Sequence, residues 1–375
     1  MFLKSFKIIV CILAVALCLS GCMTHENLSD LTIVQGVGID EDRGETKVSL
    51  QYLNLAKSGG VSEALQGNIT YVASGKSVNI SDAVATASKS LSKSIFFGQN
   101  KVLVFGGEYA KKHLSMGMDY LLRSVNSRPD VLVAMSEKKA SEIIENKERG
   151  ARIPAQNVYD LLIVGESNGL GASVTVNDLL NLYSDETSDV YMPVLSANEE
   201  SVSCKGIGIF SKEQYVYTMN AFETFGFLFV NNNIKGGLIT VSNENLGKVG
   251  VEIIKASVKN RADVKDGRIT FCCDVKVEVV LDEVEKGVTI SVDRQRIEAI
   301  ENLVSQKIET MCRSAIQVCF KHKSDPFMFG RYVSKADSKF YDSIKSNWRN
   351  TLPEIQIAVN AAAVLEKVND NSSLG

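Results

Sequence analysis

The longest uninterrupted run of hydrophobic residues lies at the start of the chain. Lys4 and Lys7 precede an apolar run from Ile8 to Leu19, and small residues then lead to Cys22. A positively charged stretch, a short apolar core and small residues are the three parts of a secretory signal peptide. As a helix this run would reach only about 18 Å, whereas the hydrocarbon core of a bilayer is about 30 Å thick. The pattern therefore predicts a cleaved signal peptide over residues 1–21 rather than a permanent transmembrane helix.

Beyond residue 30, strand patterns alternate with helical patterns through the first half of the chain. Short β-rich runs predict strands at 31–39, 47–55, 69–73, 102–105, 131–135 and 189–196. Apolar residues at helical spacing predict helices at 79–95, 108–125, 138–148, 154–164 and 176–183. Turn residues join the first two strands, so these should form a hairpin. An early hairpin favours a mixed or antiparallel sheet, and the fold class that we predict is α+β.

The second half begins with a predicted hairpin and ends with long elements. The expected elements are strands at 204–210, 214–218, 237–241, 249–260, 267–281 and 354–364, and helices at 220–230, 293–321 and 332–349. Asp266-Gly267 joins the two longest strands, and Asp-Gly between alternating segments is a strong hairpin signal. In the longest helix the apolar residues lie on one stripe, at 297, 300, 304, 308, 311, 315 and 319. This amphipathic helix should lie across the preceding sheet and bury its stripe there.

The stretch from Ala197 to Ser203 is polar and has no periodicity, so it marks the expected boundary between two domains. The predicted organisation is a signal peptide (1–21), a modified cysteine with a spacer (22–30), an N-terminal α+β domain that could contain two subdomains (31–197), a C-terminal α+β domain (198–368) and a tail (369–375).

Composition is that of a globular protein, with 45% hydrophobic and 23% charged residues. The formal net charge of −3 gives no indication of a nucleic-acid partner. Five of the eight cysteines follow Cys22, and an odd set cannot form a complete disulfide framework. Cys312 and Cys319 would lie about 10 Å apart on a helix, too far to bridge. Cys272 and Cys273 point to opposite faces of a predicted strand and should be small buried residues.

No motif in the sequence predicts a catalytic, cofactor-binding or metal-binding residue. Gly36-Val-Gly38-Ile-Asp40 lacks the third glycine and the following helix of a dinucleotide site, so we interpret its glycines as turn residues. The glycine-rich segment from Gly165 to Gly171 lacks the lysine of a phosphate loop and is interpreted as a flexible loop. Ser90-Leu-Ser-Lys93 has no partner motif of a serine acyl enzyme.

The three histidines, His25, His113 and His322, have no second histidine or cysteine at metal-ligand spacing. We place the last two on solvated helix faces, because each stands beside lysines. A pair of carboxylates for glycoside cleavage stays open, since that chemistry depends on separation in space.

Two aromatic segments pose a choice between core and interface. Phe327 and Phe329 follow the helix-ending Pro326, and Phe222, Phe225, Phe227 and Phe229 lie in a short helix. Large aromatic residues usually belong to the core, although exposed aromatics can anchor a partner. We favour the core for both segments.

Leu19-Ser20-Gly21-Cys22 resembles the lipobox of bacterial lipoproteins. That resemblance implies cleavage before Cys22 and a diacylglycerol on its sulfur, so that Cys22 is the lipid anchor. Two acyl chains hold a protein on a bilayer stably, whereas one chain does so only marginally. The alternative is an ordinary signal peptide that ends near a cysteine.

Five segments, in this order, resemble the Ger(x)C family of lipoprotein C subunits of spore germinant receptors. They are Leu31 to Asp40; Phe97-Gly98 with Lys101 to Gly106; Asp119 to Arg123; Gly206 to Phe210 with Glu223 to Gly226; and Asp325 to Gly330 with Asn347-Trp348 and Leu352-Pro353-Glu354. The chain departs from the family in having Met23-Thr24 where Trp-Asp is common, and Met328 where a glycine is common.

The resemblance implies a lipoprotein on the outer face of the spore's inner membrane, in a complex with an A subunit and a membrane-spanning B subunit. Such a complex responds to small nutrients, which its membrane subunits are expected to bind. The C subunit would be a scaffold or coupling part without catalysis or cofactor. Two alternatives stay open, a stand-alone extracytoplasmic solute-binding lipoprotein and a wall-modifying enzyme.

Overall fold

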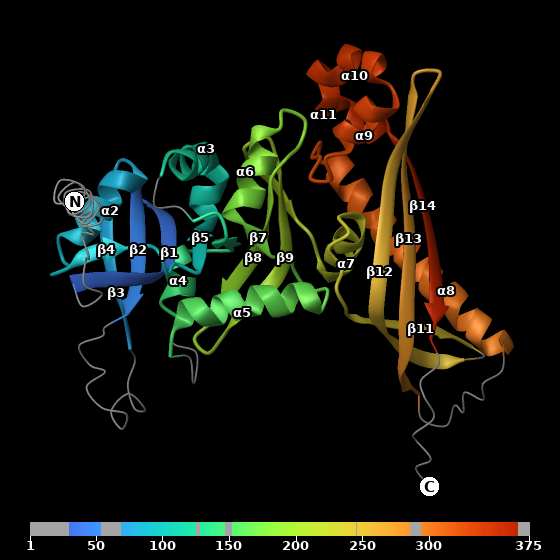
Figure 1. The fold of residues 1–375 in the computed structure, drawn as a ribbon, viewed down its shortest axis with the longest axis horizontal. Coiled ribbons are helices and arrows are strands. Elements are labelled where there is room, and N and C mark those ends of the chain that lie inside the picture. Colours follow the sequence, from blue (N-terminus) through green and yellow to red (C-terminus); the bar gives the residue numbers. More distant parts are fainter. Residues whose placement is uncertain are drawn as a thin grey trace, which may run out of the picture.

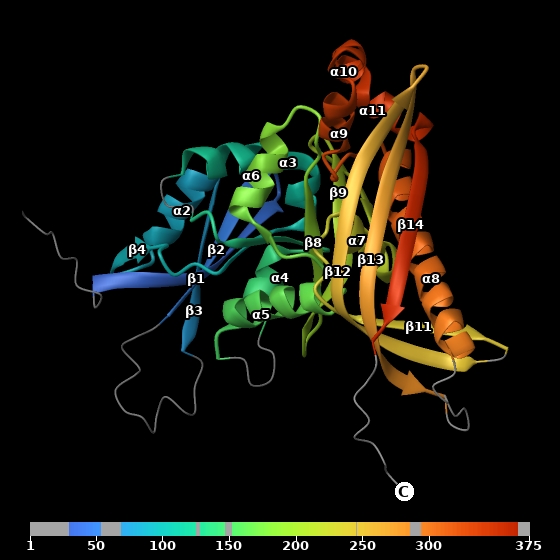
Figure 2. The same ribbon diagram turned by 45° about the vertical axis from the view of Figure 1, so that its right-hand side comes forward.

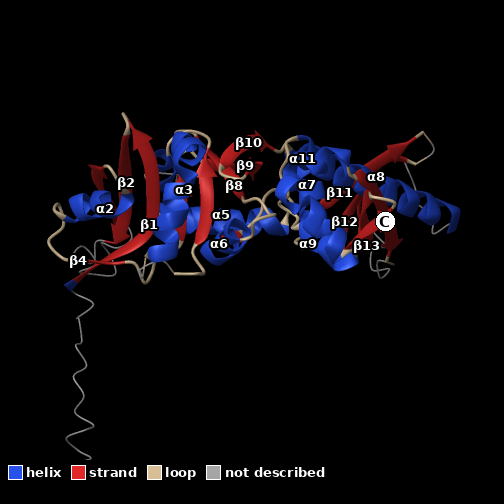
Figure 3. Cartoon of the chain, turned by 90° about the horizontal axis from the view of Figure 1, so that it is seen from above, coloured by secondary structure: helices blue, strands red, loops and turns tan. Residues whose placement is uncertain are grey.

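The computed structural model describes residues 30–53, 69–124, 128–146, 152–244, 246–285 and 294–366. Within these residues two β-sheets lie side by side along the long axis of the molecule, each with its own helices (Figures 1 and 3). We call the elements from β1 to β10 the first lobe, and those from α7 to β14 the second lobe. The predicted α+β class with mixed and antiparallel sheets is confirmed.

The sheet of the first lobe is mixed. Its strands are β1 (Leu31–Asp42), β2 (Glu45–Leu53), β3 (Thr70–Ser77), β4 (Ser94–Phe96), β5 (Val102–Phe105), β6 (Leu132–Ser136), β7 (Val174–Thr175), β8 (Tyr191–Ala197), β9 (Val202–Ser211) and β10 (Gln214–Thr218). The order is β10-β9-β8-β6-β5-β1-β2-β3, with β4 beside the start of β1 and β7 beside β6. Strands β1, β5, β6 and β8 are parallel in the centre, and antiparallel hairpins form both flanks, including the predicted β1–β2 hairpin.

Helices cover both faces of this sheet. Apolar residues of α2 (Ile80–Ser88), α3 (Gly107–Arg123) and α6 (Val176–Ser184) pack on one face, in the large hydrophobic core of the protein. On the other face, α4 (Ala140–Ile144) and α5 (Pro154–Ser167) form a second, smaller core with β5, β6 and β8. Figure 1 shows α5 running across the strands of the sheet.

The glycines of the Gly36-Val-Gly38-Ile-Asp40 segment are strand residues, so our interpretation of them as turn residues is wrong. Both lie within β1 on the face that α4 and α5 cover, where an added Cβ would press on side chains of these two helices. Glycine is needed because only a residue without a Cβ lets the helices approach the strand so closely. Asp40 then caps α4, since its carboxylate accepts from the backbone N–H groups of Ala140 (2.6 Å) and Ser141 (3.0 Å).

The sheet of the second lobe has four strands in the order β11-β12-β13-β14. They are β11 (Leu238–Asn243), β12 (Gly247–Lys265), β13 (Arg268–Val284) and β14 (Gln356–Leu365). The predicted hairpin between the two longest strands is confirmed, with Asp266 and Gly267 both at positive φ in its turn. Strand β14 comes from the end of the chain and pairs in parallel with β13.

The amphipathic helix α8 (Arg294–Lys321) packs against this sheet, as its apolar stripe predicts (Figure 2). Along the stripe Ile300, Val304, Ile308, Ala315 and Cys319 are all fully buried. Helix α7 (Ala221–Val230) lies against α8 and joins the two lobes.

Polar side chains of α8 also close the free edge of β14. The backbone N–H groups of Leu365, Ala363 and Ala361 donate to Glu301, Ser305 and Glu309 at 2.9 to 3.0 Å, and Arg313 donates to the carbonyl of Ile357 at 2.7 Å. These four α8 residues follow each other at intervals of four, so they form one row along the helix. An unpaired strand edge is a site of unwanted association, and this row satisfies its hydrogen bonds.

Three predicted helices are shorter than expected, and one of them, expected over 138–148, is the short helix α4 (Ala140–Ile144). The helix expected over 79–95 ends at Ser88, and residues 94–96 pair with β1 instead. The hydroxyls of Ser88 and Ser90 bind backbone carbonyls, in the way that serine competes with helix hydrogen bonding. The helix expected over 332–349 is broken at Asp337, whose side chain caps a new helix by accepting from Phe340 N. The resulting pieces are α9 (Phe329–Ala336), α10 (Ser338–Ile344), α11 (Trp348–Thr351) and 3₁₀ turns at Lys345–Asn347 and Leu352–Glu354.

The sheet of the first lobe continues across the expected domain boundary between residues 197 and 198. Strands β8 and β9 are antiparallel neighbours, and the polar residues between them form their hairpin connection. The division between the two sheets therefore falls later, between β10 and β11.

Replacing Gly226 with alanine should destabilise the protein. Helices α7 and α8 touch at Gly226, where a Cβ would overlap the backbone carbonyl of Met311. Alanine normally stabilises a helix by about 0.5–1 kcal/mol relative to glycine. Here we expect overpacking to reverse the sign and to lower the free energy of unfolding by about 1–3 kcal/mol, measured by denaturant titration. Gly250→Ala is the control, because a Cβ there lies at an ordinary 3.5 Å from Glu283. An equal effect of the two variants would contradict the close contact of α7 with α8.

Candidate functional site

The two lobes meet where the end of α8 and the helices after it contact the first lobe (Figure 1). We call this contact the junction. It consists of residues 185–190 before β8, residues 210–213 at the end of β9 and in the turn to β10, residues 323–330 after α8, and Trp348 and Arg349 of α11. The segment from Asp325 to Gly330, which the sequence singled out, lies inside it.

Asp189 and Arg349 form a buried ion pair across the junction. The side chain of Asp189 is fully buried and that of Arg349 is 19% exposed. Arg349 donates to Asp189 Oδ1 from Nε (3.0 Å) and Nη2 (2.8 Å). Its guanidinium also donates to the backbone carbonyls of Glu186 (3.3 Å) and Ser188 (3.1 Å), so one side chain from α11 holds the whole loop before β8.

Asp325 is a second buried carboxylate, and it organises the turn after α8. It accepts hydrogen bonds from the backbone of Phe329 (2.9 Å) and Gly330 (3.0 Å) and from the indole Nε1 of Trp348 (3.0 Å). Complete burial raises the pKa of Asp325 to about 6, because desolvation outweighs these three donors, and the nearby charge of Asp189 acts in the same direction as burial.

Hydrogen bonds to the backbone join the two carboxylate sites. The N–H of Asp325 donates to Asp189 Oδ2 (2.8 Å), and the N–H of Asp189 donates to the carbonyl of Asp325 (3.1 Å). Close by, the hydroxyl of Ser324 donates to the carbonyl of Phe210 at 2.5 Å. These groups are buried, so the two lobes share a largely buried polar network, in which the side chain of Arg349 is 19% exposed.

Aromatic rings surround this network and confirm that Phe327 and Phe329 belong to the core. Phe327 contacts Phe227 with ring centres 5.2 Å apart, and Phe329 contacts Phe271 (4.2 Å) and Trp348 (6.1 Å). Of the α7 aromatics, three are buried and Phe222 is half-buried under the ammonium of Lys307. Residues of both lobes belong to one continuous hydrophobic core.

Met328 occupies the position where the Ger(x)C pattern commonly has a glycine. Its φ of 52° and ψ of 37° place it in the left-handed region, which glycine adopts most easily. In this chain the turn after Pro326 therefore holds a methionine in a backbone conformation that favours glycine.

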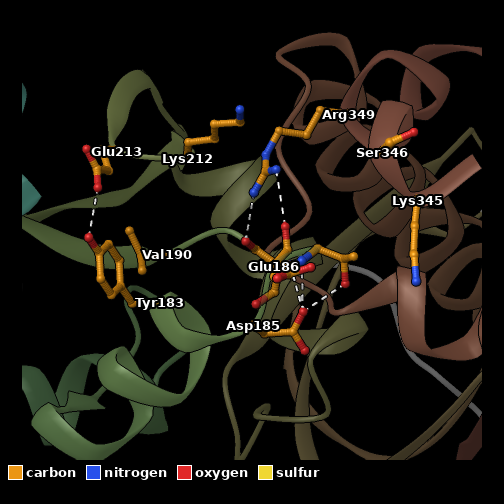
Figure 4. A pocket seen from close by; sticks show the side chains of 11 residues that line it. Tyr183, Asp185, Glu186, Val190, Lys212, Glu213, Lys345, Ser346 and Arg349 are labelled. Atoms are coloured by element: carbon orange, nitrogen blue, oxygen red, sulfur yellow. Dashed lines mark hydrogen bonds between the residues drawn. The ribbon is translucent and has the colours of Figure 1, made fainter.

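An open pocket of about 740 Å³ lies beside the junction (Figure 4). The first lobe contributes Tyr183, Asp185 and Glu213 to its walls, and the C-terminal helices contribute Lys345 and Arg349. In Figure 4, Arg349 reaches from the C-terminal helices towards the loop that carries Asp185 and Glu186, while the hydroxyl of Tyr183 donates to Glu213 at 2.8 Å. The pocket therefore presents acidic and basic groups together.

Two titratable groups of this pocket, Asp185 and Tyr183, have pKa values shifted away from neutral pH. Burial alone would raise the pKa of Asp185, but hydrogen bonds from Thr187 and the ion pair with Arg331 outweigh it and lower that pKa below its usual value. Burial and the contact with Glu213 raise the pKa of Tyr183 to about 12. Asp325 has a raised pKa, but it is fully buried and does not line the pocket.

The glycine-rich segment from Gly165 to Gly171 packs against the second lobe. Gly169 has a positive φ, and the ring of Phe225 fills the space where a side chain would be. Within the same segment, buried Glu166 forms an ion pair with Lys235 of the second lobe. The predicted flexible loop is therefore held in place by contacts with the second lobe.

The other candidates from the sequence are dispersed. His322 stacks on Tyr217 with ring centres 5.1 Å apart, and His113 contacts Tyr109. Ser90 donates to the carbonyl of Ala87 in the turn after α2. In the described part of the chain no group of three or more histidine, cysteine or acidic side chains is arranged to hold a metal ion. Cys204, Cys272, Cys273, Cys312 and Cys319 are free thiols, and all but Cys204 are buried.

The proposed lipid anchor, Cys22, lies outside the described residues. Conversely, sequence reasoning missed Asp189 and Arg349, which are 160 residues apart and have no local motif. The part of this site that the sequence did single out is the segment from Asp325 to Gly330, together with Trp348.

Comparisons with known proteins match both halves of the chain. The family model described as "Spore germination protein N-terminal domain" matches residues 24–197. The model described as "Spore germination B3/GerAC like, C-terminal" matches residues 205–368.

Individual relatives match over nearly the full length. The chain is 24% identical to spore germination protein KC of Bacillus subtilis (strain 168), over 95% of each chain. It is 22% identical to spore germination protein GerQC of Bacillus cereus, over 92% of this chain and 93% of the relative. The crystal structure of the GerBC protein has the same fold, with a TM-score of 0.59 and 15% identity, over 88% of this chain and 97% of that one.

Replacing Arg349 with alanine should lower the free energy of unfolding by about 3–5 kcal/mol, because it leaves the carboxylate of Asp189 buried without its cation. Denaturant titration of the purified chain measures this loss. Arg123→Ala serves as the control, since Arg123 and Asp119 form an exposed ion pair and their loss should change stability by about 0.5 kcal/mol or less.

Adding Asp189→Asn to the Arg349→Ala variant should recover part of the loss, since the uncompensated charge is then gone. A loss of less than about 1 kcal/mol for Arg349→Ala, or no recovery in the double variant, would show that the ion pair does not hold the lobes.

Asp325 should make stability depend on pH between about 4 and 6. Its folded-state pKa of about 6 exceeds the value of roughly 4 expected in the unfolded chain, so the folded protein holds an extra proton between these values. The stability that this group contributes is therefore fully present below about pH 4 and is lost as the pH rises to 6. We expect the free energy of unfolding of the wild type, minus that of Asp325→Asn, to fall by about 1–3 kcal/mol from pH 4 to pH 7. A difference that stays constant or grows over this range would refute the raised pKa.

Proposed function

The chain belongs to the Ger(x)C family of spore germination proteins, and on this basis we propose that it is the lipid-anchored C subunit of a nutrient germinant receptor. The observation that carries the proposal is that both family models match in order, from residue 24 to residue 368, directly behind the lipobox-like Cys22. A role in spore germination follows from the family. The anchor, the partners and the receptor are the proposal.

The proposed anchor is a diacylglycerol on the sulfur of Cys22, after removal of residues 1–21. Two acyl chains suffice for stable attachment to a bilayer. Among the described residues, no helix combines the length and hydrophobicity required to cross a membrane. The proposed location is the outer face of the spore's inner membrane, with the two lobes outside the lipid.

The proposed role is a scaffold that couples the A subunit and the membrane-spanning B subunit, without catalysis of its own. The rigidity of the junction supports this role. A continuous core and a buried polar network join the lobes, so a displacement of one lobe is transmitted to the other. Nutrient binding is assigned to the membrane subunits in this proposal.

The alternative of a stand-alone solute-binding lipoprotein has one observation in its favour, the pocket between the lobes. Such a protein would close two similar lobes around a solute. The two lobes here have different sheets, of ten and of four strands, and buried contacts already close their junction. Detergent extraction separates the two proposals, because a receptor subunit is recovered with its membrane partners and a binding protein alone.

Deleting the gene should abolish germination with at least one nutrient, in spores that lack sister receptors. The wild-type gene should restore it. Cys22→Ala should fail to restore it and should move the chain from the membrane fraction to the supernatant, since the sulfur that carries the lipid is missing.

Cys18→Ala is the matched control, because this cysteine lies in the same leader but not at the cleavage site, and it should behave as the wild type. Normal germination of the deletion strain with every nutrient would refute the receptor role. Membrane retention of Cys22→Ala would refute the lipid anchor.

A further inference from the structure

The start of β1 projects from one end of the molecule. Its first three residues, Leu31, Thr32 and Ile33, pair with β4, whereas pairing with β5 begins only at Gly36. In Figures 1 and 2 this end, with β1 and β4, lies opposite the sheet of the second lobe. We call the start of β1 together with β4 and residues 89–93 before it the β1 end.

The chain between Cys22 and the β1 end is short. Eight residues separate Cys22 from Leu31, and an extended chain advances at most about 3.6 Å per residue, so the connection spans at most about 30 Å. This step rests on the proposed function. If Cys22 carries the lipid, the β1 end is held within that distance of the bilayer surface.

The β1 end carries exposed aromatic and basic side chains. The ring of Phe96, on β4, is among the large hydrophobic side chains exposed to solvent, at 36%. Next to the β1 end, Tyr71 of β3 is 38% exposed and stacks on Tyr52, which pairs with Val34 of β1. Lys89 and Lys93 are exposed in the turn before β4. Aromatic rings favour the headgroup layer of a bilayer, and basic residues are attracted to anionic lipids.

The opposite end of β1 carries charges of both signs. Strand β1 has 12 residues and is therefore about 40 Å long. Its far end turns into β2 through Glu41, Asp42, Arg43 and Glu45, and Lys76 forms an ion pair with Asp42. The orientation therefore rests on the tether and on the aromatic and basic side chains of the β1 end.

From these observations we propose that the β1 end rests on the phospholipid surface, with the ring of Phe96 in the headgroup layer and the β1–β2 turn, at the far end of the strand, directed away from lipid. The occupant of this surface is the bilayer itself rather than a protein partner. The sheet of the second lobe, at the other end of the molecule, is then free of lipid contact.

Site-directed fluorescence in vesicles tests this orientation. The lipid-modified full chain, with Cys204→Ser to remove its partly exposed thiol, is reconstituted in vesicles of phosphatidylcholine and phosphatidylglycerol. A polarity-sensitive thiol probe is attached through Ser94→Cys, next to intact Phe96, or through Glu45→Cys at the β1–β2 turn. Lipids with a nitroxide in the headgroup quench a probe that lies at the surface.

We expect quenching at position 94 to exceed quenching at position 45 at least twofold, and Phe96→Ser to lower the quenching at position 94 at least twofold. If the chain floats with the vesicles but quenching is equal at the two positions or stronger at position 45, the proposed orientation is wrong. The lipid anchor is then still supported. Failure of the chain to float with vesicles would instead refute the lipid anchor, and the orientation with it. An unquenched probe at position 94 in floating protein would likewise overturn the orientation.

Discussion

The arrangement of the whole molecule depends on the buried contact between Asp189 of the first lobe and Arg349 of the second. Taking both charges out of water has a large desolvation cost, which is offset only when the guanidinium meets the carboxylate with good geometry. Arg349 also binds two backbone carbonyls of the same loop, and Asp189 accepts from the backbone of Asp325. Any other placement of the lobes would break these hydrogen bonds and the ion pair, so the network favours one arrangement.

The hydrophobic core around this contact holds the two lobes together. Phe227, Phe327, Phe329 and Trp348 enclose the polar network, and apolar residues of both lobes form one continuous cluster. The row of α8 side chains that closes the edge of β14 ties the last strand to the same helix that contacts α7. We expect a body built in this way to move as one unit, which the proposed coupling role requires.

Local patterns predicted most elements because their causes are local. The Asp266-Gly267 turn fixes the β12–β13 hairpin. The apolar stripe of α8 packs against the sheet of the second lobe, as the spacing of its apolar residues predicts. The hydrophobic pattern gave wrong predictions where contacts with residues distant in sequence determine the local structure. Gly36 and Gly38 are glycines because α4 and α5 press on β1, and residues 94–96 leave the expected helix to pair with β1. The ion pair at the junction joins residues 160 positions apart, and no spacing rule relates them. The resemblance to the Ger(x)C family, by contrast, could be recognised from the sequence alone, because five short segments follow each other in the order of the family.

The central claim is that the two lobes form one cooperative unit, and differential scanning calorimetry of the purified full chain tests it most directly. The account predicts one transition whose calorimetric enthalpy equals its van't Hoff enthalpy, because neither lobe can unfold without exposing the shared core and the charges at the junction. Two resolved transitions, or a calorimetric enthalpy about twice the van't Hoff value, would show that the lobes unfold independently and would contradict it.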